Sequence, residues 1–237
     1  MSKANSSSSS DSESIEPIVG CLKSASRVTG YGLPKIFIGW VDMVLLSFQG
    51  NSGEYVEALD DIVPDHCSDE DREMVAMEFA KAFGHLLSVT CDKQRPVIGD
   101  IYEAVGANSD RLGQHFTPWR LCELTAGLDI KSSDIEAATP DNPIESHDPT
   151  CGSGRMLIAH AKAIHKRDPT APVFVTGVDI SRVCAQMAVI NLILAGTSGS
   201  IIYGDSLTME YHTQWVVNFR GNEASVSRID DPKGDSE

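Results

Sequence analysis

The apolar positions of the sequence follow two different patterns along the chain. Before about residue 98 we expect a helical region, in which one segment has apolar positions recurring every three or four residues and the run at 36–48 is a buried helix or a pair of strands. The clearest helix follows Ser68, a natural N-cap before three acidic residues that suit the positive end of a helix dipole. Its apolar stripe consists of Val75, Phe79, Ala82, Phe83 and Leu86. The apolar run at 36–48 is short and contains Asp42, which indicates a buried core element rather than a membrane span.

From about residue 140 the sequence alternates between short strands and amphipathic helices. This alternation is typical of βαβ units, in which helices cover a parallel sheet. The expected elements are a strand that ends near Asp148, a helix over 155–165, a strand over 172–180, a helix over 181–196 and a strand over 200–207. We therefore expect an α/β fold: a Rossmann-like parallel sheet with helices on both faces, preceded by an N-terminal helical region.

Two flanking segments are also predicted to be helical. The first begins at Pro118, which Thr117 can cap, and its expected buried side consists of Leu121, Leu124, Thr125 and Leu128. The second, at 208–221, carries Tyr211, Trp215 and Phe219 at helical spacing. This spacing favours a helix packed on the sheet, and the alternative is an aromatic platform on which bases stack.

These patterns divide the chain into four parts. The first residues, MSKANSSSSSDSESIE, are acidic and rich in serine, which is typical of disorder. The expected parts are a disordered arm over 1–17, a helical region over 18–98, an α/β domain over 99–220 and a polar tail over 221–237.

The composition narrows the class of protein. With 237 residues, of which 41% are hydrophobic, the chain can form one sizeable core. No apolar run has membrane-spanning length and the first residues are polar, so we expect a cytoplasmic protein without a membrane partner. The six cysteines are scattered without a CxxC pair, which indicates reduced thiols rather than disulfides or a zinc site. No metal ligands are expected.

The charge balance is strongly acidic. Nineteen Lys and Arg stand against 34 Asp and Glu, a formal net charge of −15, which argues against a protein that coats nucleic acid through a basic surface. The acids serve either solubility or adaptation to high salt. Because they are spread along the chain, we favour a halophilic origin. High salt screens long-range repulsion, so a local patch could still contact DNA.

The most informative stretch is HDPTCGSGRMLIAHAKA, which starts at His147. Asp148, Asp179 and Asp205 stand where three consecutive strands are expected to end, and ligands of open parallel sheets bind beyond these ends. Gly152 and Gly154 let the turn bend sharply and approach a ligand, while the next helix offers free N–H groups. We expect Asp179 to accept hydrogen bonds from ribose hydroxyls, and Asp205 to reach a third part of the ligand.

Three carboxylates suit a neutral or cationic nucleoside and would repel a polyphosphate. A dinucleotide is a weaker interpretation, because CGSGRM lacks the GxGxxG spacing. The alternative is that each acid only caps a turn or a helix, a role in which Asp is common.

Five segments together resemble a known family: FTPWRLCELTA, DPTCGSGRMLIAHAKA, VTGVDIS, INLILAG and IIYGDSL. In order and spacing they are similar to N6-adenine DNA methyltransferases of the kind that forms the methylase subunit of type I restriction–modification systems. The resemblance runs from about Gly99 to Leu207. It implies a Rossmann-like domain that binds S-adenosylmethionine, whose sulfonium cation agrees with the acidic site.

The resemblance also implies which residues contact this cofactor. The segment against its methionine end corresponds to His115, Phe116, Thr117 and Pro118. The turn under the methionine moiety corresponds to Asp148, Pro149, Thr150, Cys151, Gly152, Ser153 and Gly154. The ribose and adenine contacts correspond to Asp179 and Ile180, and the adenine-amino contacts to Asp205 and Ser206.

The sequence departs from the family at the motif [N/D]PP[FY/W], which in the family holds the flipped target amine and stacks on the base. DNPIE at 141–145 has the wrong position and no aromatic residue, and DDPKGD at 230–235 has one proline and no aromatic residue. We therefore expect a shortened relative of the family. We assign no catalytic residue.

Two hypotheses follow. The first is an adenine-N6 DNA methyltransferase, part of or derived from a restriction–modification system, with the acceptor motif supplied by a partner chain or by an unrecognised substitute. The second is a non-catalytic remnant that binds the cofactor, DNA or a partner. Methyl transfer to adenine-containing DNA distinguishes the two.

Overall fold

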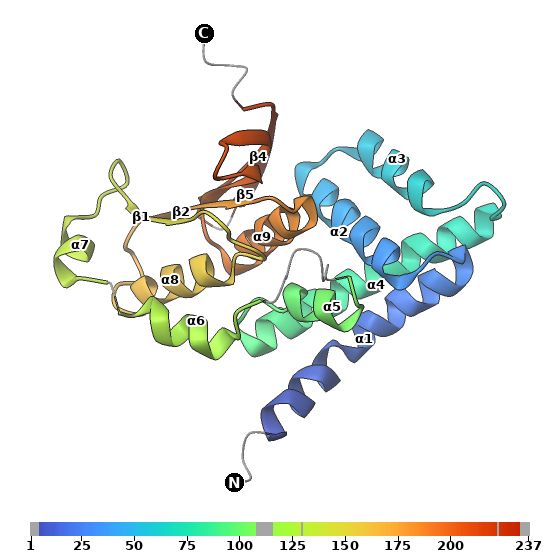
Figure 1. The fold of residues 1–237 in the computed structure, drawn as a ribbon, viewed down its shortest axis with the longest axis horizontal. Coiled ribbons are helices and arrows are strands. Elements are labelled where there is room, and N and C mark those ends of the chain that lie inside the picture. Colours follow the sequence, from blue (N-terminus) through green and yellow to red (C-terminus); the bar gives the residue numbers. More distant parts are fainter. Residues whose placement is uncertain (1–4, 108–115, 129, 222, 233–237) are drawn as a thin grey trace. The chain divides into compact units, whose positions relative to one another are not determined.

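The computed structural model describes residues 5–107, 116–128, 130–221 and 223–232. They form two compact units, Met1–His115 and Phe116–Glu237, which are described separately (Figure 1). The boundary falls later than the expected division at 98/99. The helix α5 (Ile98–Ala104) belongs to the first unit, where the ring of Tyr102 packs 5.7 Å from that of Phe37.

The first unit is helical, as the sequence predicts. Its other helices are α1 (Asn5–Thr29), α2 (Leu33–Gln49), α3 (Ser52–Ile62) and α4 (Asp69–Lys93). Ser68 and Asp71 form a reciprocal capping box at the start of α4, and α1 packs along this helix. Trp40 of α2 is buried and donates its Nε1–H to the Phe79 carbonyl at 3.2 Å. The apolar run at 36–48 is therefore a core helix.

The serine-rich arm differs from the expectation of disorder over 1–17, because α1 is helical from Asn5 onward. Ile15, Ile18 and Leu22 of α1 are buried, and a helix held by such packing can extend along a chain of modest helix propensity. Within the part of the chain that the structure describes, no single helix is long and apolar enough to cross a membrane. One bent pair, Ser14–Thr29 with Leu33–Gln49 at 110°, passes that test only when the two helices are taken together.

The second unit contains one sheet of five strands in the order β1-β2-β3-β4-β5. The first three strands are parallel to one another. The fourth strand is antiparallel to the third, and the fifth is antiparallel to the fourth. The strands are β1 (Ile144–Asp148), β2 (Val173–Asp179), β3 (Gly199–Asp205), β4 (Glu210–Arg220) and β5 (Glu223–Asp230). The helices are α6 (Trp119–Ala126), α7 (Ser132–Ala137), α8 (Arg155–His165) and α9 (Arg182–Ala195). The expected α/β class, with a helical region before it, is confirmed.

The prediction of a helix over 208–221 is wrong, because these residues form β4. A spacing of four residues fits one face of a strand as well as one face of a helix, and the β-branched and aromatic residues of EYHTQWVVNFR favour a strand. Trp215 is 2% exposed, so it packs in the core and offers no platform for bases. The expected polar tail from residue 221 contains β5, which pairs with β4.

The predicted buried side of α6 is also wrong. The exposed fractions of Leu121, Leu124 and Leu128 are 47%, 69% and 75%. The helix instead buries the small side chains Cys122 and Ala126 against α8, where close approach of the two helices requires small residues. The helix begins at Trp119 after Pro118, and the Thr117 side chain makes no capping bond.

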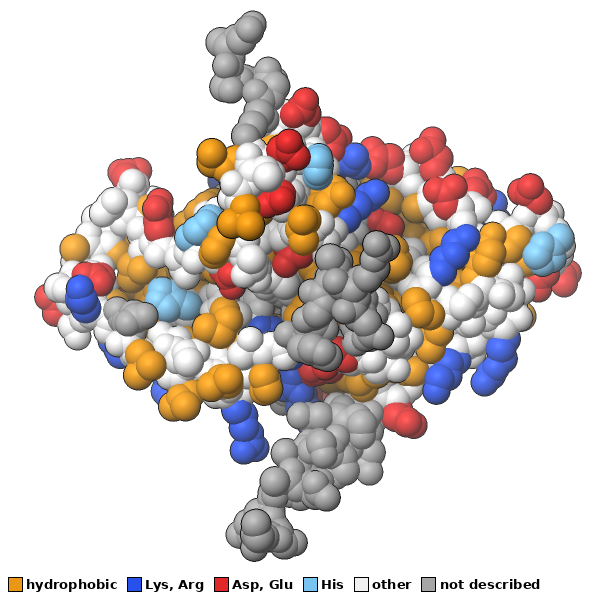
Figure 2. All heavy atoms as spheres, viewed as in Figure 1, with side chains coloured by type: hydrophobic (Ala, Val, Ile, Leu, Met, Phe, Trp, Pro, Cys, Tyr) orange, Lys and Arg blue, Asp and Glu red, His pale blue; other side chains and the backbone are white. Residues whose placement is uncertain are grey.

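Acidic side chains on the face drawn in Figure 2 are scattered over several elements, with Lys and Arg interspersed among them. Among the described residues drawn in colour there, Lys and Arg form no continuous surface of the kind that coats nucleic acid.

We expect Trp215→Ala to lower the free energy of unfolding by about 3–5 kcal/mol, because it empties a buried site in the sheet. Urea unfolding followed by circular dichroism measures the change. Asn218→Ala, at an exposed position of the same strand, is the control and should stay within about 0.5 kcal/mol of the wild type. Equal losses for both variants would contradict the placement of Trp215.

Candidate functional site

The site lies at the carboxyl ends of the parallel strands, where Asp148 ends β1, Asp179 ends β2 and Asp205 ends β3. Parallel pairing brings all three residues to the same edge of the sheet, as the sequence predicts. Asp148 accepts a hydrogen bond from the Thr150 N–H at 3.0 Å, and Asp205 accepts one from the Leu207 N–H at 2.8 Å. Each of these two acids therefore shapes the loop that follows its own strand.

Asp179 shapes two loops, because its carboxylate bonds to the turn after β1 as well as to the loop after its own strand, β2. Its Oδ2 accepts a hydrogen bond from the Gly152 N–H at 2.7 Å, and its Oδ1 accepts one from the Ser181 N–H at 2.8 Å. Burial raises the pKa of this carboxyl, the two backbone N–H donors lower it, and the nearby charge of Asp148 raises it. Asp148 and Asp179 are thus close enough to interact electrostatically.

The glycine turn between β1 and α8 needs both of its glycines. Gly152 and Gly154 have φ angles of +53° and +76°, in the left-handed region that glycine adopts without strain. A Cβ at Gly152 would lie 3.0 Å from Cε1 of Phe116, and a Cβ at Gly154 would lie 3.1 Å from Cβ of Ala188 on α9. Each glycine is therefore required by its backbone angle and by a close neighbour.

Two further hydrogen bonds hold the glycine turn, one to β2 and one from α9. The Cys151 N–H donates to the Val178 carbonyl of β2 at 2.9 Å, which extends the pairing of β1 and β2 into the turn. Asn191 of α9 is 1% exposed, and its Nδ2 donates to the Ser153 carbonyl at 2.9 Å. The sequence analysis missed Asn191, although an amide within the apolar run AVINLILA was a usable signal, because buried amides need partners.

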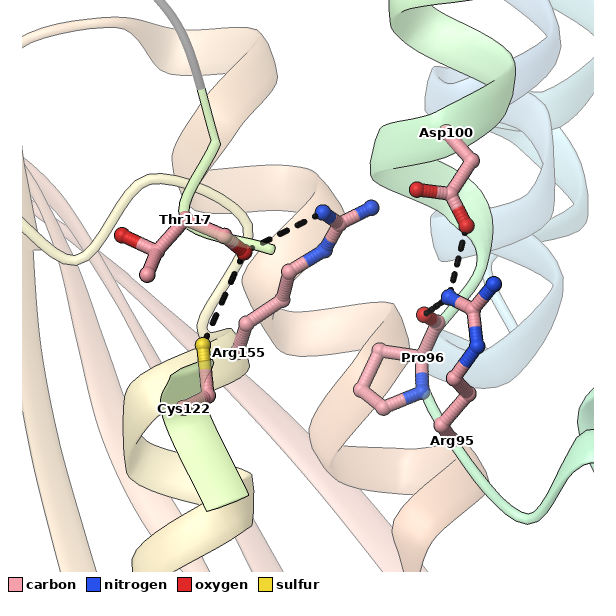
Figure 3. A network of polar contacts seen from close by, with 6 residues as sticks. All are labelled: Arg95, Pro96, Asp100, Thr117, Cys122 and Arg155. Atoms are coloured by element: carbon pink, nitrogen blue, oxygen red, sulfur yellow. Dashed lines mark hydrogen bonds and ion pairs between the residues drawn. The ribbon is translucent and has the colours of Figure 1, made fainter. Parts of the chain in front are cut away.

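The segment before α6 lies on the other side of the turn. The ring of Phe116 packs against Gly152, and the Thr117 carbonyl accepts hydrogen bonds from Nη1 of Arg155 at 3.4 Å and from the Cys122 thiol at 3.6 Å (Figure 3). The structure thus brings Phe116 and Thr117, predicted from the resemblance, to the glycine turn.

The family follows from the sequence of this region. Residues 93–224, more than half of the chain, match the family N-6 DNA Methylase. The chain belongs to this family. The description of this family names the methylation of DNA as the activity of its members.

One solved structure with a similar fold comes from Listeria monocytogenes and is described as a candidate class I S-adenosylmethionine-dependent methyltransferase. The identity is 11% and the TM-score 0.47, and the match covers 82% of this chain and 54% of that one. This chain thus spans about half the length of the Listeria protein. No curated protein sequence matches it.

The remaining predicted site residues lie in or near the same edge of the sheet. Ile180 follows Asp179 and is 59% exposed, and Ser206 follows Asp205 in the loop after β3. Pro149 and Thr150 are exposed in the glycine turn, and Pro118 precedes α6. His115 lies outside the described residues.

The buried thiols beside the turn are poor nucleophiles. Burial raises the pKa of Cys151 well above its usual value, and the charges of Asp179 and Asp148 raise it further. Burial likewise raises the pKa of Cys184 on α9 to about 12. Both side chains therefore stay protonated and serve as packing. Among the described residues no group of His, Cys, Asp or Glu is arranged to hold a metal ion.

Two sequences could replace the missing acceptor motif, and their described residues lie away from the turn. Residues 141–145 precede or begin β1 and so belong to the opposite edge of the sheet. Asp230 ends β5 on the same edge as Asp179, but β3 and β4 separate it from β2, a distance of about 14 Å at the usual strand spacing. It is also paired with Arg228 at 2.9 Å.

The residues at the turn fit S-adenosylmethionine. The half-buried carboxylates of Asp148 and Asp179 complement a ligand that carries an ammonium, a sulfonium and ribose hydroxyls.

We expect Gly152→Ala to weaken binding of S-adenosylhomocysteine at least tenfold, because the added methyl group pushes Phe116 from the turn. Gly196→Ala is the matched control: its φ is +66°, but no atom lies within 4 Å of the new Cβ. Both variants should lose roughly 1–2 kcal/mol of stability through left-handed strain, and only Gly152→Ala should lose affinity. Calorimetric titration of both variants measures this, and equal affinities would contradict the assigned contact.

Proposed function

We propose that the chain transfers a methyl group from S-adenosylmethionine to N6 of adenine in DNA, as part of or derived from a restriction–modification system in the cytoplasm. The family supports a DNA methyltransferase. The observation that carries the proposal is the junction of Asp179 and the glycine turn at the carboxyl edge of the sheet, held by the 2.7 Å bond from the Gly152 N–H.

In this proposal the chain orients the cofactor through the turn and its neighbours. Asp179 accepts hydrogen bonds from the ribose hydroxyls, which its carboxylate can do while keeping both backbone donors, because it has about four acceptor positions. Ile180 lies against the adenine, and Asp205 with Ser206 contacts the adenine amino group. The residues at 148–154 and 115–118 enclose the methionine end, and the cofactor itself supplies the electrophilic methyl group.

The second partner in the reaction is the target adenine. Transfer requires its amine to lie in line with the methyl group, so that positioning supplies most of the rate enhancement. We propose that a partner chain supplies the groups that hold the amine. This agrees with the distance of about 14 Å between the tip of β5 and that of β2.

A second candidate function is a remnant that binds the cofactor without transferring its methyl group. The segment after β3 favours it, because the described residues there form the β4–β5 hairpin and Asp230 at its end is paired with Arg228. Labelled S-adenosylmethionine incubated with adenine-containing DNA in molar salt separates the two candidates. If the chain binds the cofactor but transfers no methyl group, cofactor binding is the function of this chain alone.

Asp179→Ala should weaken binding of S-adenosylhomocysteine at least about 100-fold, because it removes a charged acceptor from the ligand and frees the glycine turn. Asp168→Ala is the control, since Asp168 also accepts a backbone N–H two residues on, from Thr170 at 2.8 Å, but lies in the loop after α8. Titration calorimetry on folded protein gives both affinities. If Asp179→Ala binds with unchanged affinity, Asp179 does not accept hydrogen bonds from the ribose hydroxyls.

A further inference from the structure

A buried cation lies beside the glycine turn, and neither the family match nor the resemblance gives it a role. Arg155 is the first residue of α8 and is 5% exposed. A guanidinium taken out of water requires acceptors and neighbours that compensate for its lost hydration. Its neighbours therefore indicate what the residue does.

The first neighbour is the backbone of the segment before α6. Nη1 of Arg155 donates to the Thr117 carbonyl at 3.4 Å, and Figure 3 shows the side chain extending from α8 toward that oxygen. The Cys122 thiol donates to the same carbonyl at 3.6 Å. One carbonyl thus receives a donor from α8 and a donor from α6.

The second neighbour is the ring of Phe116, whose centroid lies 5.5 Å from the guanidinium carbon, within the range of cation–π attraction. The same ring lies where a Cβ at Gly152 would be only 3.0 Å from its Cε1. Arg155 therefore contacts the ring that covers the glycine turn.

Packing between α6 and α8 does not by itself fix this ring. Cys122 and Ala126 of α6 meet Ala159 of α8, at least one helical turn along from Arg155. Phe116 and Thr117 precede α6, and Pro118 between them and the helix has no backbone N–H to donate. Arg155 contacts both residues, the ring of Phe116 and the carbonyl of Thr117.

We propose that Arg155 is a positioning residue of the cofactor site. Its guanidinium holds the segment 116–118 against the glycine turn, so that this side of the site is in place before the ligand arrives. Lysine cannot replace it, because the role needs a planar group that stacks on a ring while donating to a carbonyl. The inference rests on the proposed function, since the ligand is the cofactor of that site.

The test is a double-mutant cycle with S-adenosylhomocysteine as the probe, measured by titration calorimetry. Arg155→Lys and Phe116→Ala should each weaken binding about tenfold or more, and the double variant should be no weaker than Phe116→Ala. Lys162→Met is the matched control: Lys162 lies on the same helix, 5.8 Å from the ring of Trp119 on α6, but away from the turn. It should bind as the wild type does.

Hydrogen exchange of the ligand-free protein gives a second readout that needs no binding. In Arg155→Lys the peptide that covers residues 117–124 should exchange faster, whereas in Lys162→Met it should not. Unchanged exchange, additive losses in the cycle, or wild-type affinity of Arg155→Lys overturns the proposal. If Arg155→Lys does not fold, Phe116→Ala must still show both the weaker binding and the faster exchange. A wild type that binds no S-adenosylhomocysteine overturns the proposed function, and the exchange result then decides the role of Arg155 separately.

Discussion

The hydrogen bond from the Gly152 N–H to Asp179 is the interaction on which the site depends. It joins the end of β2 to the turn after β1, and the second oxygen of the same carboxylate holds the start of the loop before α9. Hydrogen bonds to a charged acceptor contribute about 1.5–3 kcal/mol, more than those between neutral groups. Burial raises the pKa of Asp179, and these two N–H donors oppose that rise. The acid that is assigned to the ligand is therefore also part of the frame that forms the site.

Around this bond, residues from three parts of the chain meet at one short turn: the segment before α6, the helix α9 and the strand β2. Phe116 covers Gly152, Ala188 lies against Gly154, Asn191 holds the Ser153 carbonyl, and Val178 pairs with the Cys151 N–H. These contacts come from segments up to 75 positions apart in the sequence, from Phe116 to Asn191. A turn fixed from so many directions has little freedom to adjust, which suits a site whose ligand must be held in one orientation.

The sequence predicted the features of this unit that depend on local pattern. The strands that end at Asp148, Asp179 and Asp205 and the two helices between them were predictable, because period and turn residues agree there. It failed at β4, where Tyr211, Trp215 and Phe219 fit both periods, and at α6, where hydrophobicity favoured the leucines but close helix packing selected Cys122 and Ala126. The roles of Asn191 and Arg155 could not be read from the sequence, because each depends on a partner 38 positions away. Side-chain chemistry alone does not identify such partners.

The strand order has a consequence for how this unit is made. Each strand of the sheet pairs with the strand that precedes it in the chain, from β1 to β5 without exception among the described strands. Pairing between strands that are consecutive in the chain closes shorter loops than pairing across the whole sheet, and so costs less loop entropy. As the chain leaves the ribosome, every new strand finds an already completed neighbour, so the sheet can grow in the direction of synthesis. The glycine turn would then be among the first parts of the sheet to be assembled, before β4 and β5 exist.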